Sequence, residues 1–151
     1  MNIEIYTDGS CKRNPGPGGY AFIIIRGKNE LLRMYGIEEK TTNNRMELKA
    51  IVRSIKHAIR IETKEEIIIY SDSAYCLNPI NCGWIYSWFA NDWKTKDGKE
   101  VKNCDLWKEL YSLINNKKNK FKFIKVKGHS GNKYNEEVDK LAKKASSFDC
   151  L

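Results

Sequence analysis

The sequence has no apolar stretch long enough to cross a lipid bilayer. Its longest apolar or aromatic run is Tyr20–Ile25, whereas a membrane-spanning helix needs roughly 20 such residues. The first eight residues carry two acids and no basic start, so no secretory signal peptide is expected. We therefore expect a cytoplasmic protein without a membrane partner. Its length of 151 residues fits a single domain.

Histidine is scarce, and the cysteines do not form pairs. The two histidines leave little room for a histidine-rich metal site. The five cysteines are an odd number without a Cys-X-X-Cys pair, which argues against a disulfide framework or a zinc ribbon. We expect reduced thiols at all five positions: Cys11, Cys76, Cys82, Cys104 and Cys150.

Positive charge, by contrast, is abundant and concentrated. The net charge is +8, and the segment from Lys94 to Lys127 holds eleven lysines against four acids. Such a basic block is typical of proteins with a polyanionic partner. A solvated surface would have the same composition, so charge alone leaves both interpretations open.

The hydrophobic pattern predicts an α/β protein. Alternating and β-branched residues predict strands at Ile3–Thr7, Tyr20–Arg26, Leu31–Ile37, Glu66–Ser71 and Phe121–Val126, with a turn cluster at Asn14–Gly19. Helical spacing predicts a helix capped by Asn43-Asn44, a helix over Ser73–Asn91 that is broken at Pro79 and Gly83, and helices at Asn103–Ile114 and Asn135–Ala145. We expect Trp107 to lie in the core.

The order of these elements, βββαβααβα, predicts a mixed sheet. The first three strands form an antiparallel meander because short turns join them. Strands separated by helices pair in parallel, so the first, fourth and fifth strands should run parallel at the centre. In such sheets, ligands bind outside the carboxyl ends of the parallel strands.

Two aspartates follow the predicted strands at that edge. Asp8 comes directly after the first strand and Asp72 directly after the fourth. Neighbouring carboxylates repel each other unless a cation lies between them, and oxygen ligands suit Mg²⁺ or Mn²⁺. A single aspartate after a strand is more often a turn residue.

Two further acids, Glu47 and Asp139, fall in the first turns of predicted helices. An acid at that position can simply stabilise the helix dipole. The polar run before Glu47, Thr41–Arg45, serves no apolar core and favours a functional role.

Five segments resemble the motifs of the type 1 ribonuclease H family, in order and over nearly the whole chain. They are Tyr6–Cys11 with Asn14–Tyr20, Thr41–Leu48, Tyr70–Ser73, Val126–Asn132 and Asn135–Ala142. The resemblance implies the ribonuclease H-like α/β fold, a five-stranded mixed sheet with helices on both faces. It also implies a monomer with one catalytic domain over residues 1–151 and no separate N-terminal hybrid-binding domain.

The resemblance also implies an activity: hydrolysis of the RNA strand of an RNA–DNA hybrid, leaving 5′-phosphate and 3′-hydroxyl ends. Asp8, Glu47, Asp72 and Asp139 would hold two Mg²⁺ ions, which Mn²⁺ could replace. Two cations about 4 Å apart can stabilise both the attacking water and the leaving oxygen. His129, between Gly128 and Gly131, would assist proton transfer or product release.

The family further implies a surface for the hybrid. Cys11, Asn14, Asn43 and Asn44 would line its minor groove, where the 2′-hydroxyl distinguishes RNA from DNA. Thr42 and Asn14 would hold a phosphate of the DNA strand. The alternative is that the asparagines serve as turn and cap residues, and both roles are compatible.

Residues 83–103 resemble the basic protrusion of many bacterial members. Aromatic residues interleaved with lysines suit contact with a nucleic-acid backbone, and the candidates are Trp84, Trp88, Lys94, Lys96 and Lys99. Trp84 and Trp88 share one helix face, so they can equally well pack the protrusion together.

The sequence departs from the family pattern in two places. Ala74 stands where many relatives carry an RNA-contacting glutamine, and Phe89-Ala90-Asn91 occupies a stretch that is often basic. The contact of that glutamine is therefore absent or replaced. Four lysines of the protrusion remain, so the second change predicts hybrid binding that is weaker without being lost: Lys94, Lys96, Lys99 and Lys102. Rival hypotheses are a catalytically silent binding module, an integrase-like enzyme that acts on DNA, and an electrostatic RNA-binding protein; none explains the ordered acids together with the glycine-rich loop.

Overall fold

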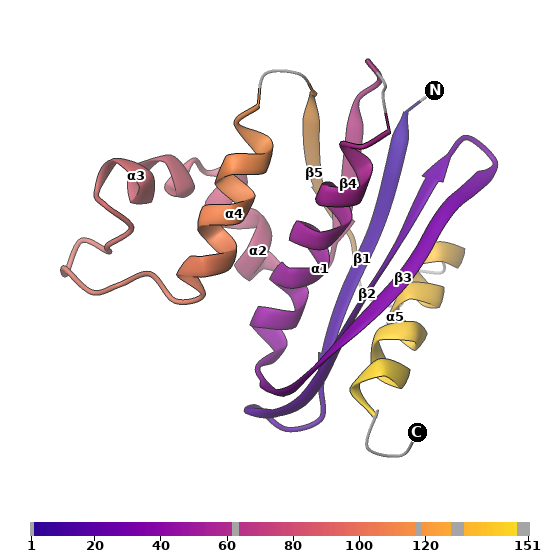
Figure 1. Ribbon diagram of the computed structural model, residues 1–151, viewed down its shortest axis with the longest axis horizontal. Coiled ribbons are helices and arrows are strands. Elements are labelled where there is room, and N and C mark those ends of the chain that lie inside the picture. Colours follow the sequence, from indigo (N-terminus) through magenta and orange to yellow (C-terminus); the bar gives the residue numbers. More distant parts are fainter. Residues whose placement is uncertain (1, 62–63, 117–118, 128–131, 148–151) are drawn as a thin grey trace.

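A five-stranded sheet forms the centre of the computed structural model, which describes residues 2–61, 64–116, 119–127 and 132–147 (Figure 1). Its strands are β1 (Ile3–Cys11), β2 (Gly16–Arg26), β3 (Asn29–Thr41), β4 (Ile67–Ser71) and β5 (Phe121–Lys125). The spatial order is β3-β2-β1-β4-β5. Strands β1 to β3 pair antiparallel, while β4 pairs in parallel with both β1 and β5. The predicted mixed sheet is confirmed, but β5 forms an edge of the sheet and does not lie at its centre.

The meander strands are longer than the sequence pattern predicts. Strand β1 continues to Cys11, because its antiparallel pairing with β2 extends beyond Tyr6, where the parallel pairing with β4 ends. Asp8 therefore lies within β1 and not after it. The predicted turn cluster is also shorter, because β2 already begins at Gly16. A side chain at Gly19 would overlap α5 at Ala145, so this glycine permits close packing of the helix on β2.

The first helix, α1 (Asn43–Ala58), buries the apolar face that its periodicity predicts. Leu48, Ile51, Val52 and Ile55 are all fully buried. The cap is Thr42 and not Asn43-Asn44, since the Thr42 side chain accepts a hydrogen bond from the backbone N–H of Arg45 at 3.2 Å.

Within the described residues, three helices connect β4 to β5, where the sequence predicts one broken helix and one further helix. They are α2 (Ala74–Asn81), α3 (Trp84–Ala90) and α4 (Cys104–Ile114). The predicted break at Gly83 is confirmed, and this residue has a φ of 80°, which suits glycine. The predicted break at Pro79 is wrong. Pro79 removes one backbone donor, yet α2 continues through it to Asn81 with the proline buried.

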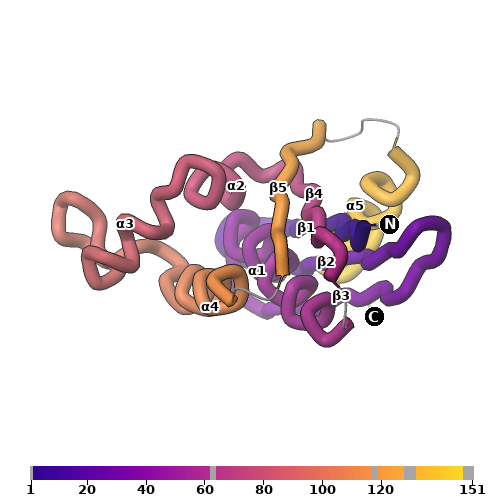
Figure 2. The backbone as a smooth tube through the Cα atoms, turned by 90° about the horizontal axis from the view of Figure 1, so that it is seen from above, coloured from indigo at the N-terminus to yellow at the C-terminus, as the bar shows by residue number. Residues whose placement is uncertain are grey.

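Helices cover both faces of the sheet (Figures 1 and 2). Helix α5 (Lys133–Ser146) packs on β1 and β2, where Val138 and Ala142 meet Tyr6 and Ile23. Helices α1 and α4 form the layer on the other face, over a larger core in which the predicted core residue Trp107 is fully buried. Packing on two faces gives the central strands a rigid setting for any side chains at their ends.

Helix α3 and the chain that follows it, residues 84–103, extend from this body as a protrusion (Figure 2). Its loop is a small hairpin: the backbone N–H of Thr95 donates to the carbonyl of Lys99 at 2.7 Å, and Lys94 pairs with Glu100. Four cysteines are free thiols as predicted, while Cys150 lies outside the described residues. Among the described helices, none has the length and apolarity that crossing a membrane requires.

Candidate active site

Three acids from different parts of the chain meet at one edge of the sheet. Oxygen atoms of Asp8, Glu47 and Asp72 all lie within 4.8 Å of one another. Asp8 comes from β1, Glu47 from α1, and Asp72 directly follows β4, as predicted. The meeting of Asp8 and Asp72 is the one that adjacent parallel strands were expected to produce.

A close approach of α1 to β1 brings Glu47 to this edge. A Cβ atom on Gly9 would overlap the backbone nitrogen of Glu47, and it would lie 2.5 Å from the carbonyl carbon of Met46. Only glycine leaves room for this contact. The first turn of α1 contains no acid, and Glu47 lies beyond it. The predicted placement of Glu47 in that turn is therefore wrong.

Burial makes this carboxylate cluster electrostatically unfavourable by itself. Desolvation, followed by the charges of neighbouring acids, raises the pKa of Asp8 to about 7 and that of Glu47 well above its usual value. Atom Oε2 of Glu47 is buried without a hydrogen-bond partner. Converging carboxylate oxygens that are buried and partly unsatisfied fit a hard divalent cation.

Asp139 lies beside these three acids but outside their group as the structure describes it. The carboxylate of Asp139 forms an ion pair with Lys143 at 3.1 Å. Burial is the main cause of the raised pKa of Asp8, and a side-chain hydrogen bond between Asp8 and Asp139 raises it further. Helix α5 begins at Lys133, two residues before the predicted start. Asp139 therefore lies beyond the first turn, and the helix dipole does not explain it.

His129, the candidate proton carrier, lies outside the described residues. The structure describes the residues on either side, up to Lys127 and from Asn132. The buried Asn135 donates from Nδ2 to the carbonyl oxygen of Lys127 at 3.1 Å, and Asn132 caps α5 by accepting from the N–H groups of Tyr134 and Asn135. These bonds fix the two ends of the segment that carries His129.

The loop after β1 is joined to the start of α1. Oδ1 of Asn14 accepts a hydrogen bond from the backbone N–H of Asn43 at 2.9 Å. Sγ of Cys11 lies 2.6 Å from the carbonyl oxygen of Arg13 and 3.4 Å from that of Thr41. The candidate hybrid-reading residues Cys11, Asn14, Thr42 and Asn43 therefore gather in one place, and Asn44 is exposed in the first turn of α1.

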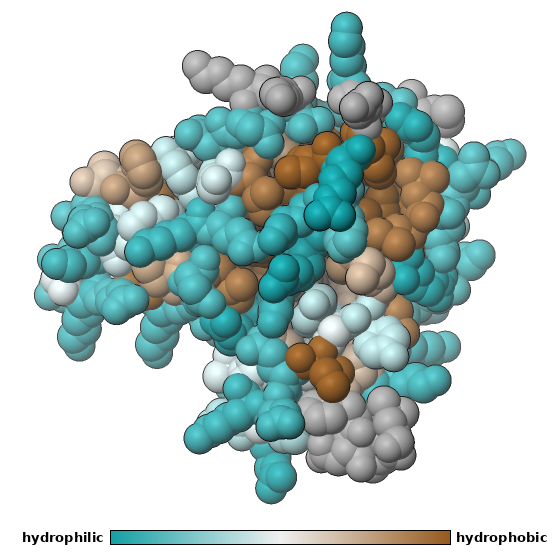
Figure 3. Space-filling view, viewed as in Figure 1, coloured by the Kyte–Doolittle hydropathy of each residue, from teal (hydrophilic) through white to brown (hydrophobic). Residues whose placement is uncertain are grey.

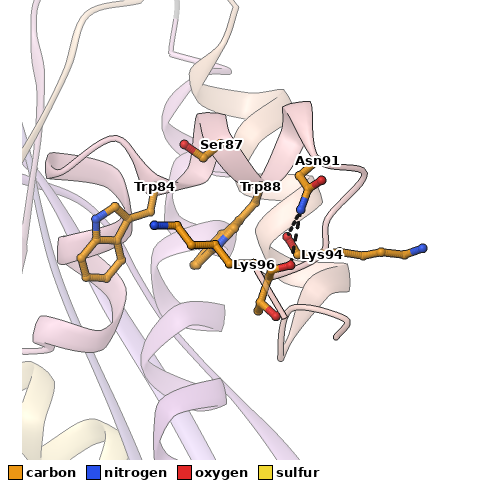
Figure 4. Close-up of a pocket in the computed structure, with 7 residues that line it drawn as sticks. Trp84, Ser87, Trp88, Asn91, Lys94 and Lys96 are labelled. Carbon is orange, nitrogen blue, oxygen red and sulfur yellow. Dashed lines mark hydrogen bonds between the residues drawn. The ribbon is translucent and has the colours of Figure 1, made fainter. Parts of the chain in front are cut away.

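The protrusion gathers four of its five candidate residues. Trp84, Trp88, Lys94 and Lys96 line one pocket (Figure 4). Figure 4 shows the Lys96 side chain extending toward the two indoles, while that of Lys94 points away from them. Trp88 also packs edge-on against Trp107 at 5.3 Å, whereas Trp84 is 48% exposed. Lys99 is exposed on the hairpin but does not line this pocket.

Two lysines beside the acids were not predicted as site residues from the sequence. Lys125 and Lys127 line a pocket together with Asp72. Lys125 ends β5, and the N–H of Val126 continues the pairing with β4 by donating to the carbonyl of Ser71 at 2.9 Å. The rule that drew attention to Asp8 and Asp72, proximity to the carboxyl ends of parallel strands, would have found both lysines.

An acidic centre at the carboxyl edge of a mixed α/β sheet, bordered by lysines, is compatible with a nuclease. The comparison with known families is specific: the chain belongs to the ribonuclease H family, whose model, described as RNase H, matches residues 1–147. The resemblance seen in the five motifs is thereby confirmed, and the chain is an enzyme of the nuclease class.

Individual relatives agree with this assignment. A protein named Ribonuclease H from Caldicellulosiruptor saccharolyticus is 49% identical over 142 residues, which cover 93% of each chain. LC9-RNase H1, a type 1 RNase H with the type 2 active-site motif, is 28% identical, with a TM-score of 0.80 over 97% of this chain and 72% of its own. LC11-RNase H1, solved in complex with an RNA/DNA hybrid, shares the fold at 20% identity, with a TM-score of 0.77 over 99% of this chain and its own full length.

Proposed function

We propose that this enzyme hydrolyses the RNA strand of RNA–DNA hybrids by a two-metal-ion mechanism. The observation that carries the proposal is the convergence of Asp8, Glu47 and Asp72 within 4.8 Å. Membership of the ribonuclease H family supports the substrate, as does the hybrid bound by the related LC11-RNase H1.

The proposed ligands of two Mg²⁺ ions, or of Mn²⁺ in their place, are Asp8, Glu47, Asp72 and Asp139. When bound, the cations supply Lewis-acid stabilisation of the charge that builds up at the phosphodiester. The protein holds the buried oxygens of Asp8 and Glu47 at fixed positions through β1 and α1, so little reorganisation is required when the reaction proceeds.

His129 is proposed to assist proton transfer or product release. In the hydrolysis, a water oxygen bonds to phosphorus as the bond to the 3′-oxygen breaks, and that oxygen takes up a proton. One fragment would then carry a 5′-phosphate and the other a 3′-hydroxyl. The described residues on either side of His129 are tied to α5, through the cap by Asn132 and the bond from Asn135 to Lys127. Lys125 and Lys127, beside Asp72, carry positive charge where a scissile phosphate would approach.

Two surfaces are proposed to bind the hybrid. Cys11, Asn14, Thr42, Asn43 and Asn44 would read its minor groove and hold a DNA phosphate, and the bond between Asn14 and Asn43 supports their acting as one unit. Trp84, Trp88, Lys94, Lys96 and Lys99 of the protrusion would contact its backbone. Hydrophilic side chains project from the protrusion on the face seen in Figure 3. The whole chain is proposed to act as a cytoplasmic monomer with one catalytic domain.

The decisive experiment is a cleavage panel with Mg²⁺ and with EDTA. The substrates are an RNA–DNA hybrid, an RNA duplex, a DNA duplex and the single strands, with a label on each strand in turn. Cleavage of the RNA strand of the hybrid alone, and only with metal, is the expected result. Cleavage of DNA would favour an integrase-like activity. Binding without any cleavage would favour a silent module or an RNA-binding protein, and either result would overturn the proposal.

A further inference from the structure

Arg45 connects three elements near the acidic edge. Its guanidinium holds both carboxylate oxygens of Asp105, at 3.0 Å and 2.7 Å, and lies 3.4 Å from Glu38 near the end of β3. Arg45 is in the first turn of α1, two residues before Glu47, and Asp105 is in the first turn of α4. Bidentate pairing of this kind fixes orientation as well as distance.

The connection extends into the base of the protrusion. Arg45 also donates to Oδ1 of Asn103 at 3.4 Å, and Nδ2 of Asn103 donates to the hydroxyl of Tyr75 at 3.0 Å. The same hydroxyl accepts from Nε1 of Trp107, against which the protrusion residue Trp88 packs. Asn103 has a φ of 57°, a left-handed conformation that asparagine tolerates better than most residues.

We propose that Arg45 is a positioning residue that holds the protrusion at a fixed position relative to the carboxylate centre. This inference rests on the proposed function. Arg45 binds Asn103, which ends the protrusion, and it lies two residues before Glu47 of the centre on the same helix. A hybrid long enough to touch both surfaces is bound most tightly when their relative placement is already fixed, because less ordering is needed on binding.

The choice of arginine follows from the geometry. All three guanidinium nitrogens are used: Nη1 and Nη2 hold Asp105, Nη1 also contacts Asn103, and Nε faces Glu38. A lysine ammonium is a compact charge and does not reproduce this planar arrangement. Arg45→Lys therefore preserves the charge and removes the fixed orientation.

The test compares KM and kcat on two hybrids, a short one that spans the carboxylate centre alone and a long one that also reaches the protrusion. For Arg45→Lys and Asp105→Asn, KM should rise about fivefold on the long hybrid and stay constant on the short one. The kcat of both variants should fall by no more than about twofold on either hybrid. The double variant should be no worse than either single variant, since both remove the same interaction.

Arg33→Lys is the matched control. Arg33 forms a similar two-point pair with Glu30, at 3.0 Å and 2.7 Å, on β3 away from the protrusion, and its replacement should leave both KM values unchanged. Equal losses on the short and long hybrids, or additive effects in the double variant, would overturn the inference. Equilibrium binding of both hybrids in EDTA gives the same comparison without turnover. Absence of cleavage by the unsubstituted enzyme would contradict the proposed function, and the binding ratio would still decide the role of Arg45.

Discussion

The acidic edge and the protrusion of this protein are built on different principles. Asp8 and Glu47 are buried, and packing of backbone on backbone at Gly9 fixes them. The protrusion presents exposed lysines on a small hairpin and the half-exposed Trp84 at the start of α3. Chemistry at a phosphodiester requires oxygens at defined positions, whereas attraction of a polyanion tolerates variation in the position of each charge. Substitutions in the first region should therefore act on catalysis, and those in the second on affinity.

The largest effect is expected for Asp8→Asn. The change keeps the size of the side chain and removes one charge from the centre, so cleavage of a labelled hybrid should fall by about a thousandfold or more while the fold persists. Circular dichroism and thermal melting check the fold. Asp97→Asn, which neutralises an exposed acid in the protrusion hairpin, is the matched control and should retain activity. Near-normal turnover by Asp8→Asn with metal supplied would contradict the assignment of the acidic centre.

The second prediction concerns the stability of the metal-free protein. Burial and neighbouring acids raise the pKa of Asp8 from 3.8 to about 7. A proton is therefore held more tightly in the folded state. The stabilisation is fully present below pH 3.8 and is lost as the pH rises through about 7. Thermal melting in EDTA should show Tm falling over this range by on the order of several degrees.

Metal and mutation should both remove this pH dependence. Mg²⁺ added above pH 7 should raise Tm, because an ion that binds only the folded state stabilises it. Asp8→Asn should melt at a higher temperature than the parent in EDTA at pH 8, since one repelling charge is gone. Asp97→Asn should follow the parent curve. A parent Tm that is independent of both pH and Mg²⁺ would show that the acids do not repel one another strongly enough to matter.

The two regions also differ in how far the sequence predicts them. The meeting of Asp8 and Asp72 follows from strand order, because the ends of neighbouring parallel strands must share an edge. The polar run before Glu47 indicates a functional role, but the meeting of Glu47 with the two aspartates could be predicted only from the family resemblance. The close approach of α1 to β1 depends on the absence of a side chain at Gly9, which hydrophobic periodicity does not encode. Helix boundaries were the weakest predictions, as the placements of Glu47 and Asp139 show.

In the protrusion, the sequence identifies the residues but not their partners. The spacing of Trp84 and Trp88 predicts a shared helix face, and both do line one pocket. Trp88 packs on Trp107, whereas Trp84 stays half exposed. This difference depends on the tertiary position of α4, which the local spacing does not encode. The pairing of Arg45 with Asp105 joins residues 60 positions apart and has no local signature either.

The smallest effects are expected for single lysines of the protrusion. Lys96 extends toward the exposed indole of Trp84, whereas Lys94 points away (Figure 4). Lys96→Gln should therefore weaken hybrid binding several-fold and reduce the dependence of log Kd on log salt by about one unit, with a smaller change for Lys94→Gln. Lys28→Gln, in the exposed turn between β2 and β3, is the control and should change neither quantity. A salt response of hybrid binding that is flat in the unsubstituted protein, or equal slopes for all three variants, would show that the protrusion does not bind the phosphate backbone.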